Sequence, residues 1–223
     1  PSKGITFENL HFDGAKRCID IAKDEQVRRF ILMSANGVKK NGTGYQKTKM
    51  MAEEYLKWSE LEYTIFRPSL IFGDPRGGGR PEFCTQLKKD MLGLPFPAPN
   101  FHTGLNPFKA GNFALSPIHA QDVASIFVNS INEKKTVNKA YELGGEAYYW
   151  KEVIKIISGA YGKNKWIIPA PVFAVKSLAS IFGRFAWFPI TKDQLTMLVE
   201  GNVCSSEDVF DMFEISPIPF NSE

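Results

Sequence analysis

The sequence has few of the residues that build disulfide frameworks or metal sites. Its 223 residues contain only three cysteines and three histidines, and all six are far apart along the chain. Widely spaced thiols exclude a disulfide scaffold and a cysteine-rich metal site, and they fit a reducing compartment. We therefore predict a cytoplasmic protein without a metal centre. The six residues are Cys18, Cys84, Cys204, His11, His102 and His119.

Strong charge bias and long apolar runs are also absent. The net charge is only +3 and the basic residues are spread out, which excludes a nucleic-acid-binding surface of the usual kind. The most apolar stretch, residues 167–190, is interrupted by Pro169, Lys176 and Arg184, so it does not predict a membrane span. A buried or groove-lining helix is the better interpretation. The chain begins at Pro1 and no charged-then-apolar leader follows it.

A third absence concerns glycine. No G-x-G-x-x-G or G-x-x-G-x-x-G turn opens a helix after a strand, although such a turn usually holds a dinucleotide pyrophosphate. What the sequence does contain is enough apolar material for a sizeable core, because 43% of its residues are hydrophobic and 13% are aromatic. A folded domain is therefore expected, without the usual phosphate-binding fingerprint inside the chain.

The order of the predicted elements is typical of an α/β protein. Residues 29–34 form a short, nearly continuous apolar run, as expected of a parallel strand that is buried on both faces. Apolar residues at helical spacing predict helices before and after that strand. The complete prediction is helices at 7–24, 45–59, 121–131, 150–161, 171–185, 191–198 and 206–213, and strands at 29–34, 63–72 and 140–145.

This order predicts a doubly wound, parallel, Rossmann-like sheet with a smaller, mostly helical C-terminal lobe. Three strands are few for such a sheet, and the 29–34 strand would keep an unpaired apolar edge. We therefore expect the fold to be N-terminally truncated, with its first strands and glycine-rich turn upstream of Pro1. Residues 1–75 and 113–145 would form the C-terminal part of the NAD(P)-binding domain, and residues 76–112 and 146–223 the substrate-side lobe.

Catalytic chemistry is indicated by Tyr45 and Lys49, which have the spacing Y-x-x-x-K. Residues four apart share one face of a helix, so the ammonium would lie beside the phenol. A neighbouring positive charge lowers the pKa of a tyrosine, and this prepares it to exchange a proton with a carbonyl or alcohol. Ser34, at the carboxyl end of the preceding strand, could supply a hydroxyl to the same substrate oxygen. Alone, the Y-x-x-x-K spacing is also common on solvated helix faces.

Other residues leave two interpretations open. Five phenylalanines in the second half could line an apolar substrate pocket or simply fill a core. Arg67 and Glu53 could form a structural ion pair, and neither is predicted to be catalytic. The phenylalanines are Phe83, Phe96, Phe101, Phe108 and Phe113.

Five short motifs occur in an order that resembles the NAD(P)-dependent epimerase/dehydratase group of extended or atypical short-chain dehydrogenase/reductases. The nearest resemblance is to the branch that includes the Rossmann-fold accessory subunit of respiratory complex I. The resemblance covers nearly the whole chain. The motifs are residues 34–37 (SANG), Tyr45 and Lys49 with Glu53, residues 66–73 (FRPSLIFG), residues 117–124 (PIHAQDVA) and residues 141–145 (YELGG).

The resemblance implies a bound NAD or NADP. Tyr45 and Lys49 would hold the nicotinamide ribose, and the backbone of Pro68, Ser69, Leu70 and Ile71 would face the nicotinamide. Ser34 and Tyr45 would polarise a substrate oxygen, so that Ser34, Tyr45 and Lys49 form the catalytic set. It also implies a homodimer that pairs through the helices at 7–24 and 45–59.

Three functions remain open at this point. The first is an NAD(P)-dependent oxidoreductase or epimerase that acts on a small carbonyl or alcohol. The second, suggested by the complex I branch, is an NAD(P)-binding accessory or assembly protein without turnover, peripherally associated with a membrane complex. The third is an NAD(P)-sensing regulator that keeps the fold but does not need Tyr45.

Overall fold

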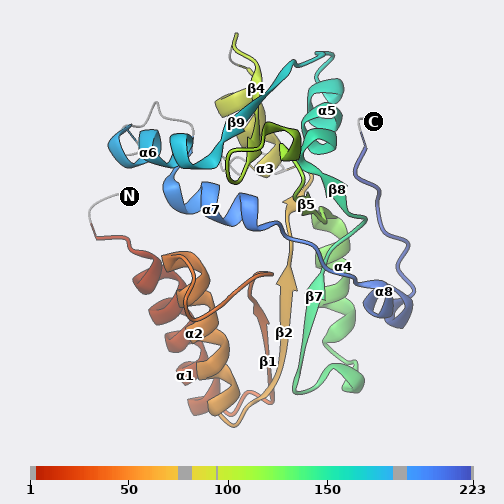
Figure 1. The fold of residues 1–223 in the computed structure, drawn as a ribbon. Coiled ribbons are helices and arrows are strands. Elements are labelled where there is room, and N and C mark those ends of the chain that lie inside the picture. The colour runs from red at the N-terminus through yellow and green to blue at the C-terminus, as the bar shows by residue number, and fades with distance from the viewer. Residues whose placement is uncertain (1–3, 75–81, 94, 183–189, 222–223) are drawn as a thin grey trace. The chain divides into compact units, whose positions relative to one another are not determined.

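The structure is a computed structural model that describes residues 4–74, 82–93, 95–182 and 190–221 (Figure 1). The chain divides into two compact units, and each is built from segments that are discontinuous in sequence. Unit 1 comprises Pro1–Ser69, Asp122–Leu143 and Ser205–Ser216. Unit 2 comprises Leu70–Gln121, Gly144–Cys204 and Pro217–Glu223.

The centre of unit 1 is a three-stranded parallel sheet. Its strands are β1 (Arg29–Met33), β2 (Glu62–Pro68) and β7 (Lys139–Leu143), in the order β1-β2-β7. The three predicted strands and their parallel arrangement are therefore confirmed. Within the described residues β1 pairs with β2 alone, and Met33 on this edge strand is 43% exposed.

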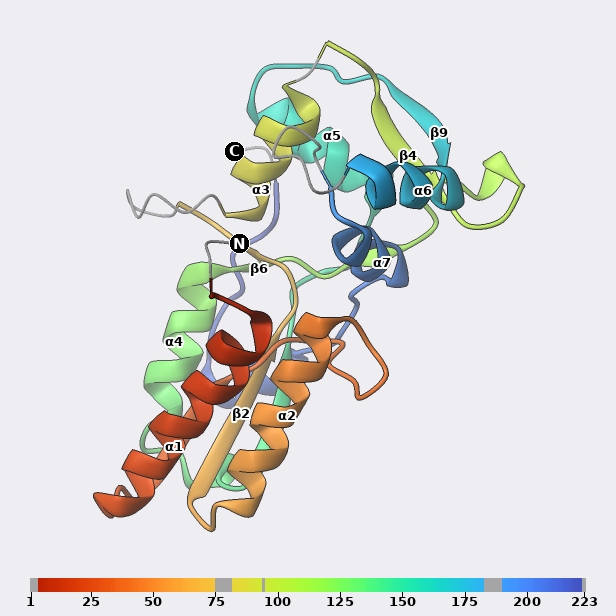
Figure 2. The same cartoon turned by 90° about the vertical axis from the view of Figure 1, so that its left-hand side faces the viewer.

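Helices cover both faces of this sheet because successive side chains of a strand point to opposite faces. Ile65 of β2 packs with Ile19 of α1 (Gly14–Asp24) and Leu56 of α2 (Gly44–Trp58). The next residue, Phe66, faces the other way, and its ring lies 4.9 Å from that of Phe127 in α4 (Ala120–Ser130). Figures 1 and 2 both show α1 and α2 side by side, and Figure 1 shows β2 between this pair and α4.

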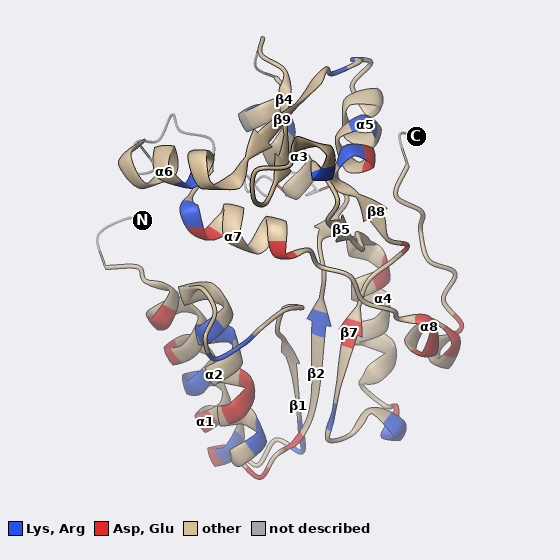
Figure 3. Ribbon diagram, viewed as in Figure 1, with Lys and Arg blue, Asp and Glu red and all other residues tan. Residues whose placement is uncertain are grey.

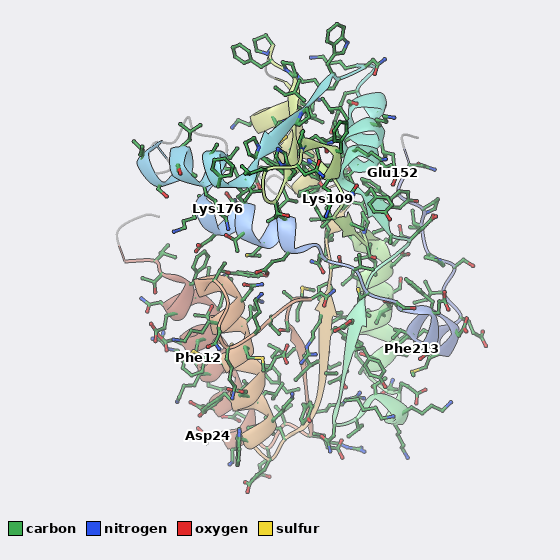
Figure 4. The ribbon with its side chains drawn as sticks, viewed as in Figure 1. Phe12, Asp24, Lys109, Glu152, Lys176 and Phe213 are labelled. Carbon is green, nitrogen blue, oxygen red and sulfur yellow. The ribbon has the colours of Figure 1, made fainter. Side chains whose placement is uncertain are left out.

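The predicted helix at 7–24 is confirmed, but its first part is wider than an α-helix. Residues Glu8–Asp13 form a π-helix, η1, that continues directly into α1. At their junction, the Phe12 ring (labelled in Figure 4) meets the ring of Tyr55 in α2 edge to face. Acidic and basic residues alternate over α1 and α2 (Figure 3), as expected for a solvated helix surface.

Arg29 ties β1 to the end of α4. Its guanidinium donates to the carbonyl oxygens of Ser130, Ile131 and Glu133 at 2.8–3.2 Å. It also donates to the hydroxyl of Thr64 at 2.6 Å and to that of Thr136. The last carbonyl groups of a helix have no partner within the helix, so this cation satisfies groups that would otherwise need water. The short 3₁₀ helix η4 (Lys134–Thr136) then leads into β7.

The predicted strand at 63–72 is divided in two, and this part of the prediction was wrong. β2 ends at Pro68, and the Ser69 amide donates to Leu143 O at 2.7 Å. The chain then enters unit 2 as β3 (Ile71–Phe72), which pairs in parallel with β6 (Ile118–His119). The apolar run is continuous in sequence, but its hydrogen-bond partners change at Ser69.

In the described part of unit 2 more residues lie in helices than in strands, but it contains short strands that the sequence did not predict. β4 (Ala98–His102) pairs in parallel with β9 (Ile167–Pro171), and β5 (Ala114–Leu115) pairs antiparallel with β8 (Tyr148–Tyr149). Prolines within β4 and β9 obscure the pattern, since proline is depleted in strands.

Among its described residues, unit 2 has three helices that the sequence predicts and three that it does not. They are α3 (Phe83–Leu87), the π-helix η2 (Lys88–Leu92), the 3₁₀ helix η3 (Pro107–Lys109), α5 (Trp150–Ala160), α6 (Val172–Phe182) and α7 (Lys192–Glu200). α3, η2 and η3 were not predicted, and residues 183–185 of the helix predicted at 171–185 lie outside the described residues. The last predicted helix is α8 (Glu207–Phe213), which belongs to unit 1.

Helix starts in both units carry capping boxes. In α2 the amide of Thr43 donates to Gln46 Oε1 at 2.8 Å, and in α7 Thr191 and Gln194 are paired in the same way. In α5 Glu152, labelled in Figure 4, accepts from the amide of Tyr149 at 2.8 Å. Such reciprocal bonds satisfy amides at a helix start and fix where the helix begins.

Among the described residues, none of the helices has the length and apolarity needed to cross a bilayer. The same part of the chain contains no group of three or more histidine, cysteine or acidic side chains placed to hold a metal ion.

Candidate functional site

Tyr45 and Lys49 lie one turn apart at the beginning of α2, as the Y-x-x-x-K spacing predicts. The capping box at Thr43 starts the helix just before Tyr45. Lys49 extends toward the sheet, and its Nζ donates to Met33 O at 3.0 Å. The ammonium is thereby anchored at the carboxyl end of β1, the edge of a parallel sheet where ligands bind in this class of fold.

Ser34 follows β1 directly and is only 3% exposed. Its amide donates to Phe66 O at 2.7 Å, and the amide of Asn36 donates to Pro68 O at 2.9 Å. These two bonds continue the β1–β2 pairing beyond the strand and fix Ser34 beside the end of β2. The buried Ser34 Oγ has no hydrogen-bond partner within the described part of the chain. A buried hydroxyl without a partner costs free energy, and ligand binding is one reason for such an atom to persist.

The aromatic surroundings of Tyr45 come from the N-terminal helix. The His11 ring lies 5.1 Å from the Tyr45 ring, edge to face, and the Phe7 ring lies 6.1 Å away. Phe7 and His11 also stack on each other at 5.8 Å. His11 was missed by the sequence analysis. Its i, i+4 spacing from Phe7 placed both on one helix face, but only the tertiary fold brings that face to Tyr45.

The expected lowering of the Tyr45 pKa is not observed. Burial raises the pKa of Tyr45 because a desolvated phenolate is disfavoured. Burial also lowers the pKa of Lys49, although the negative charge of Glu53 opposes this shift. The expectation considered only the pairwise attraction between ammonium and phenolate. In the folded chain the ammonium instead donates to a backbone carbonyl, and desolvation is the larger effect on the phenol.

His11 introduces a pH dependence of stability. Its pKa is lowered, first by burial and second by the positive charge of Lys49. Between the lowered pKa and the unfolded value near 6.5, the unfolded chain binds more protons, so stability rises with pH. The contribution of neutral His11 to the free energy of unfolding is complete above about pH 6.5. It is lost as the pH falls toward the pKa of His11 in the folded chain. Urea titrations from pH 5 to pH 7.5 should show this slope, and the His11→Gln variant should lose part of it. Equal slopes in both proteins would contradict the prediction.

The four backbone positions predicted to face the nicotinamide are in different structural settings. Pro68 is the buried last residue of β2, and the Ser69 amide is bonded to Leu143 O. Leu70 O accepts from the amide of Ile118, and Ile71 is paired with Ile118 in β3. The structure brings Ser34 and Pro68 together within unit 1, whereas Leu70 and Ile71 belong to unit 2. Their assignment to the cofactor stays a prediction.

The expected ion pair between Arg67 and Glu53 is confirmed. Both carboxylate oxygens of Glu53 accept from the guanidinium, at 2.9 and 2.6 Å. Glu53 is fully buried in α2 and Arg67 is 24% exposed on β2. The hydrogen bond to Glu53 is the main reason that the pKa of Arg67 is raised. The pair therefore fixes the helix of Tyr45 to the strand that lies beside Ser34.

The five phenylalanines do not share one role. Phe101 and Phe113 stack on Trp150 in the core of unit 2, with ring centroids 6.1 and 5.8 Å away. Phe83 lines a cavity in unit 2. Phe96 and Phe108 are largely exposed. A pocket lined by all five is therefore excluded. The core interpretation holds for Phe101 and Phe113, and the role of Phe83 in substrate binding stays a prediction.

The residues at the carboxyl end of β1 suit a nicotinamide ribose. Ser34 offers a buried hydroxyl, Tyr45 a phenol and Lys49 a cation, and hydroxyl groups of a ribose can accept from all three. Lys49 Nζ has donors beyond the one used by Met33 O, because an ammonium carries three. These three side chains would hold the group.

Comparison with known proteins supports the cofactor class. Residues 3–90 match a family model described as NAD(P)H-binding. The photosystem II assembly factor Ycf39 of Trieres chinensis is 25% identical over 219 residues, covering 96% of this chain and 63% of the relative. The mitochondrial NADH-ubiquinone oxidoreductase 40 kDa subunit of Neurospora crassa is 24% identical over 192 residues, covering 85% of this chain and 47% of the relative. The chain thus spans about half to two thirds of the length of these relatives.

Among solved structures, a nucleoside-diphosphate-sugar epimerase from Staphylococcus aureus has a similar fold. Its TM-score is 0.68 at 20% identity, and the alignment covers 99% of this chain and 72% of the epimerase. Together the matches confirm the α/β Rossmann-like fold, the resemblance that the ordered motifs indicate and the cofactor class. Residues 3–90 match an NAD(P)H-binding family model, and the chain shares its fold with the epimerase.

Proposed function

We propose that the chain is the catalytic part of an NAD(P)-dependent oxidoreductase or epimerase that acts on a small carbonyl or alcohol. The observation that carries the proposal is the arrangement at the end of β1. There Lys49 is anchored to Met33 O, Tyr45 lies one turn away, and the buried hydroxyl of Ser34 has no partner within the described residues. Residues 1–75 and 113–145 would serve the cofactor, and residues 76–112 and 146–223 the substrate.

The protonation states suit proton donation by Tyr45. Because burial raises its pKa, the phenol is protonated at neutral pH and can act as a general acid toward a carbonyl oxygen. When bound, NAD(P) supplies or accepts the hydride. Ser34 would donate a second hydrogen bond to the same oxygen and stabilise the charge that develops on it. Lys49 would orient the ribose and stabilise a Tyr45 phenolate after the proton has left.

Replacing Tyr45 with phenylalanine tests this role. Turnover should fall by about 10²–10⁴-fold, because the proton donor is removed while the ring and its packing remain. NAD(P) binding should change by only a few fold. The measurement is cofactor oxidation with a panel of small carbonyl compounds, together with calorimetric titration of the cofactor, in the whole encoded protein.

Tyr55→Phe is a matched control on the same helix. The Tyr55 hydroxyl donates to Asp20 at 2.5 Å, away from Lys49, so this variant should keep turnover. Wild-type protein that binds NAD(P) but turns over no carbonyl or alcohol would reject the enzyme proposal.

The second candidate is an NAD(P)-binding accessory or assembly protein without turnover. It is favoured by two relatives, of which one is an assembly factor and the other a subunit of NADH-ubiquinone oxidoreductase. Under this proposal the protein associates peripherally with a membrane complex, and Tyr45→Phe has no functional effect. Co-purification with such a complex, lost when α6 is altered, would favour it. A homodimer through α1 and α2 and a cytoplasmic location are further expectations, testable by light scattering and cell fractionation.

A further inference from the structure

We infer that unit 2 carries a binding site for an uncharged, mainly apolar small molecule. The site is a cavity of about 230 Å³, here called the unit 2 cavity. Its walls come from the consecutive helices α3 and η2, and from α5 and α7, which follow later in the sequence. The lining residues that indicate the polarity of its ligand are Phe83, Met91, Trp150, Met197 and Leu198, with Gln86 and Gln194.

The lining that the structure describes disfavours a charged ligand. Nine of the twelve lining side chains are apolar or aromatic, and the other three are the amides Gln86, Gln194 and Asn202. No ionisable side chain is among the residues described around it. A phosphate or carboxylate in such a site would lose its hydration without gaining a counter-charge, at a large cost in affinity. The unit 2 cavity is therefore unsuited to a sugar nucleotide, which carries a diphosphate.

Two polar side-chain groups of the wall already have hydrogen-bond partners within unit 2. Trp150 is fully buried, and its indole N–H donates to Pro99 O at 3.0 Å, so the ring contributes no polar atom that lacks a partner. Gln194 Oε1 accepts from the amide of Thr191 at 2.9 Å as part of the α7 capping box. Its amide nitrogen can donate to one polar group of a ligand. Gln86 and Gln194 are both exposed, so this polar contact would form near the solvent side.

The volume sets the size of the ligand. A dry apolar cavity of about 150 Å³ in another protein accommodates benzene. The unit 2 cavity is half as large again, which suits one ring with a short substituent, roughly nine to twelve heavy atoms. The inferred class is therefore a neutral alcohol, ketone or phenol with a compact hydrocarbon body. This inference concerns unit 2 alone and does not depend on the catalytic role of Tyr45.

Methionine methyl groups provide a direct test. Met91 and Met197 line the cavity, whereas the other four methionines belong to unit 1. The probes are 2-phenylethanol, which is neutral, and phenylacetate, which has nearly the same shape but is anionic. In spectra of ¹³C-methyl-methionine protein, 2-phenylethanol should shift the Met91 and Met197 signals with a dissociation constant of roughly millimolar or tighter. Phenylacetate should bind at least about tenfold more weakly.

A filled cavity provides the matching variant. Leu198→Trp should abolish the shift at Met91, and Leu105→Trp, the same change at an 86% exposed position of unit 2, should leave it intact. Circular dichroism checks that both variants fold. If Leu198→Trp does not fold, the comparison of the two probes in the wild-type protein tests the inference. No shift at Met91 and Met197, equal binding of the two probes, or displacement of 2-phenylethanol by UDP-glucose would each overturn the inference.

Discussion

Replacing Arg67 with methionine is expected to lower the free energy of unfolding by about 3–5 kcal/mol. Glu53 is fully buried, and both of its oxygens accept from the Arg67 guanidinium. Without Arg67, a desolvated carboxylate remains in the interior with no charged partner. Methionine keeps much of the apolar stem of arginine, so most of the loss should come from the charge and its two hydrogen bonds. Chemical denaturation followed by circular dichroism measures it.

Two further variants separate the buried charge from the general effect of removing a cation. Lys40→Met breaks an exposed ion pair with Glu54, in which the Lys40 side chain is 72% exposed. This change should lower the free energy of unfolding by about 0–1 kcal/mol. The double variant Arg67→Met with Glu53→Leu removes both charges, and should recover part of the lost stability because no buried charge is left. A single Arg67→Met variant as stable as Lys40→Met would contradict the assignment.

Replacing Trp150 with alanine should destabilise unit 2 by about 3–5 kcal/mol. Trp150 is fully buried, stacks between Phe101 and Phe113, and donates its indole N–H to Pro99 O. Alanine would leave a large void, and Pro99 O would lose a donor. Thermal unfolding followed by circular dichroism measures the effect.

The matched control is Trp166→Ala. Its side chain is 79% exposed, so the same loss of atoms should change stability by less than about 0.5 kcal/mol. Similar losses for both tryptophans would show that Trp150 is not the centre of the core. Because the two units can unfold separately, each titration should be fitted for more than one transition.

The parts of the fold that sequence predicts well are those with local signals. The run at 29–34 predicts a strand because four of its six residues are apolar, and β1 occupies 29–33. The predicted burial on both faces was wrong, because the residues of β1 are only partly buried or exposed. The Y-x-x-x-K spacing placed Tyr45 and Lys49 on one face of α2, since helical geometry alone determines it. The Arg67–Glu53 pair was expected because opposite charges occur on adjacent predicted elements. The structure adds that the Glu53 side chain is fully buried.

What sequence could not supply depends on partners far along the chain. The end of β2 at Pro68 is set by Leu143 and Ile118, which lie 50 residues or more away. β4 and β9 form one pair although about 65 residues separate them, and prolines mask both. The raised pKa of Tyr45 has the same origin. Burial is a tertiary property, so the sequence showed the nearby Lys49 but not the desolvation that dominates.

The path of the chain between the units has a consequence for how the protein is made. Unit 1 is completed only by Ser205–Ser216, and unit 2 only by Pro217–Glu223. During synthesis, β1 and β2 emerge from the ribosome more than 70 residues before β7. Until β7 has been made, the edge of β2 that pairs with it stays unpaired. Neither unit can be excised as one continuous segment. Chaperone dependence during synthesis should therefore be greatest while residues 69–139 are being added, before the sheet can close against its third strand.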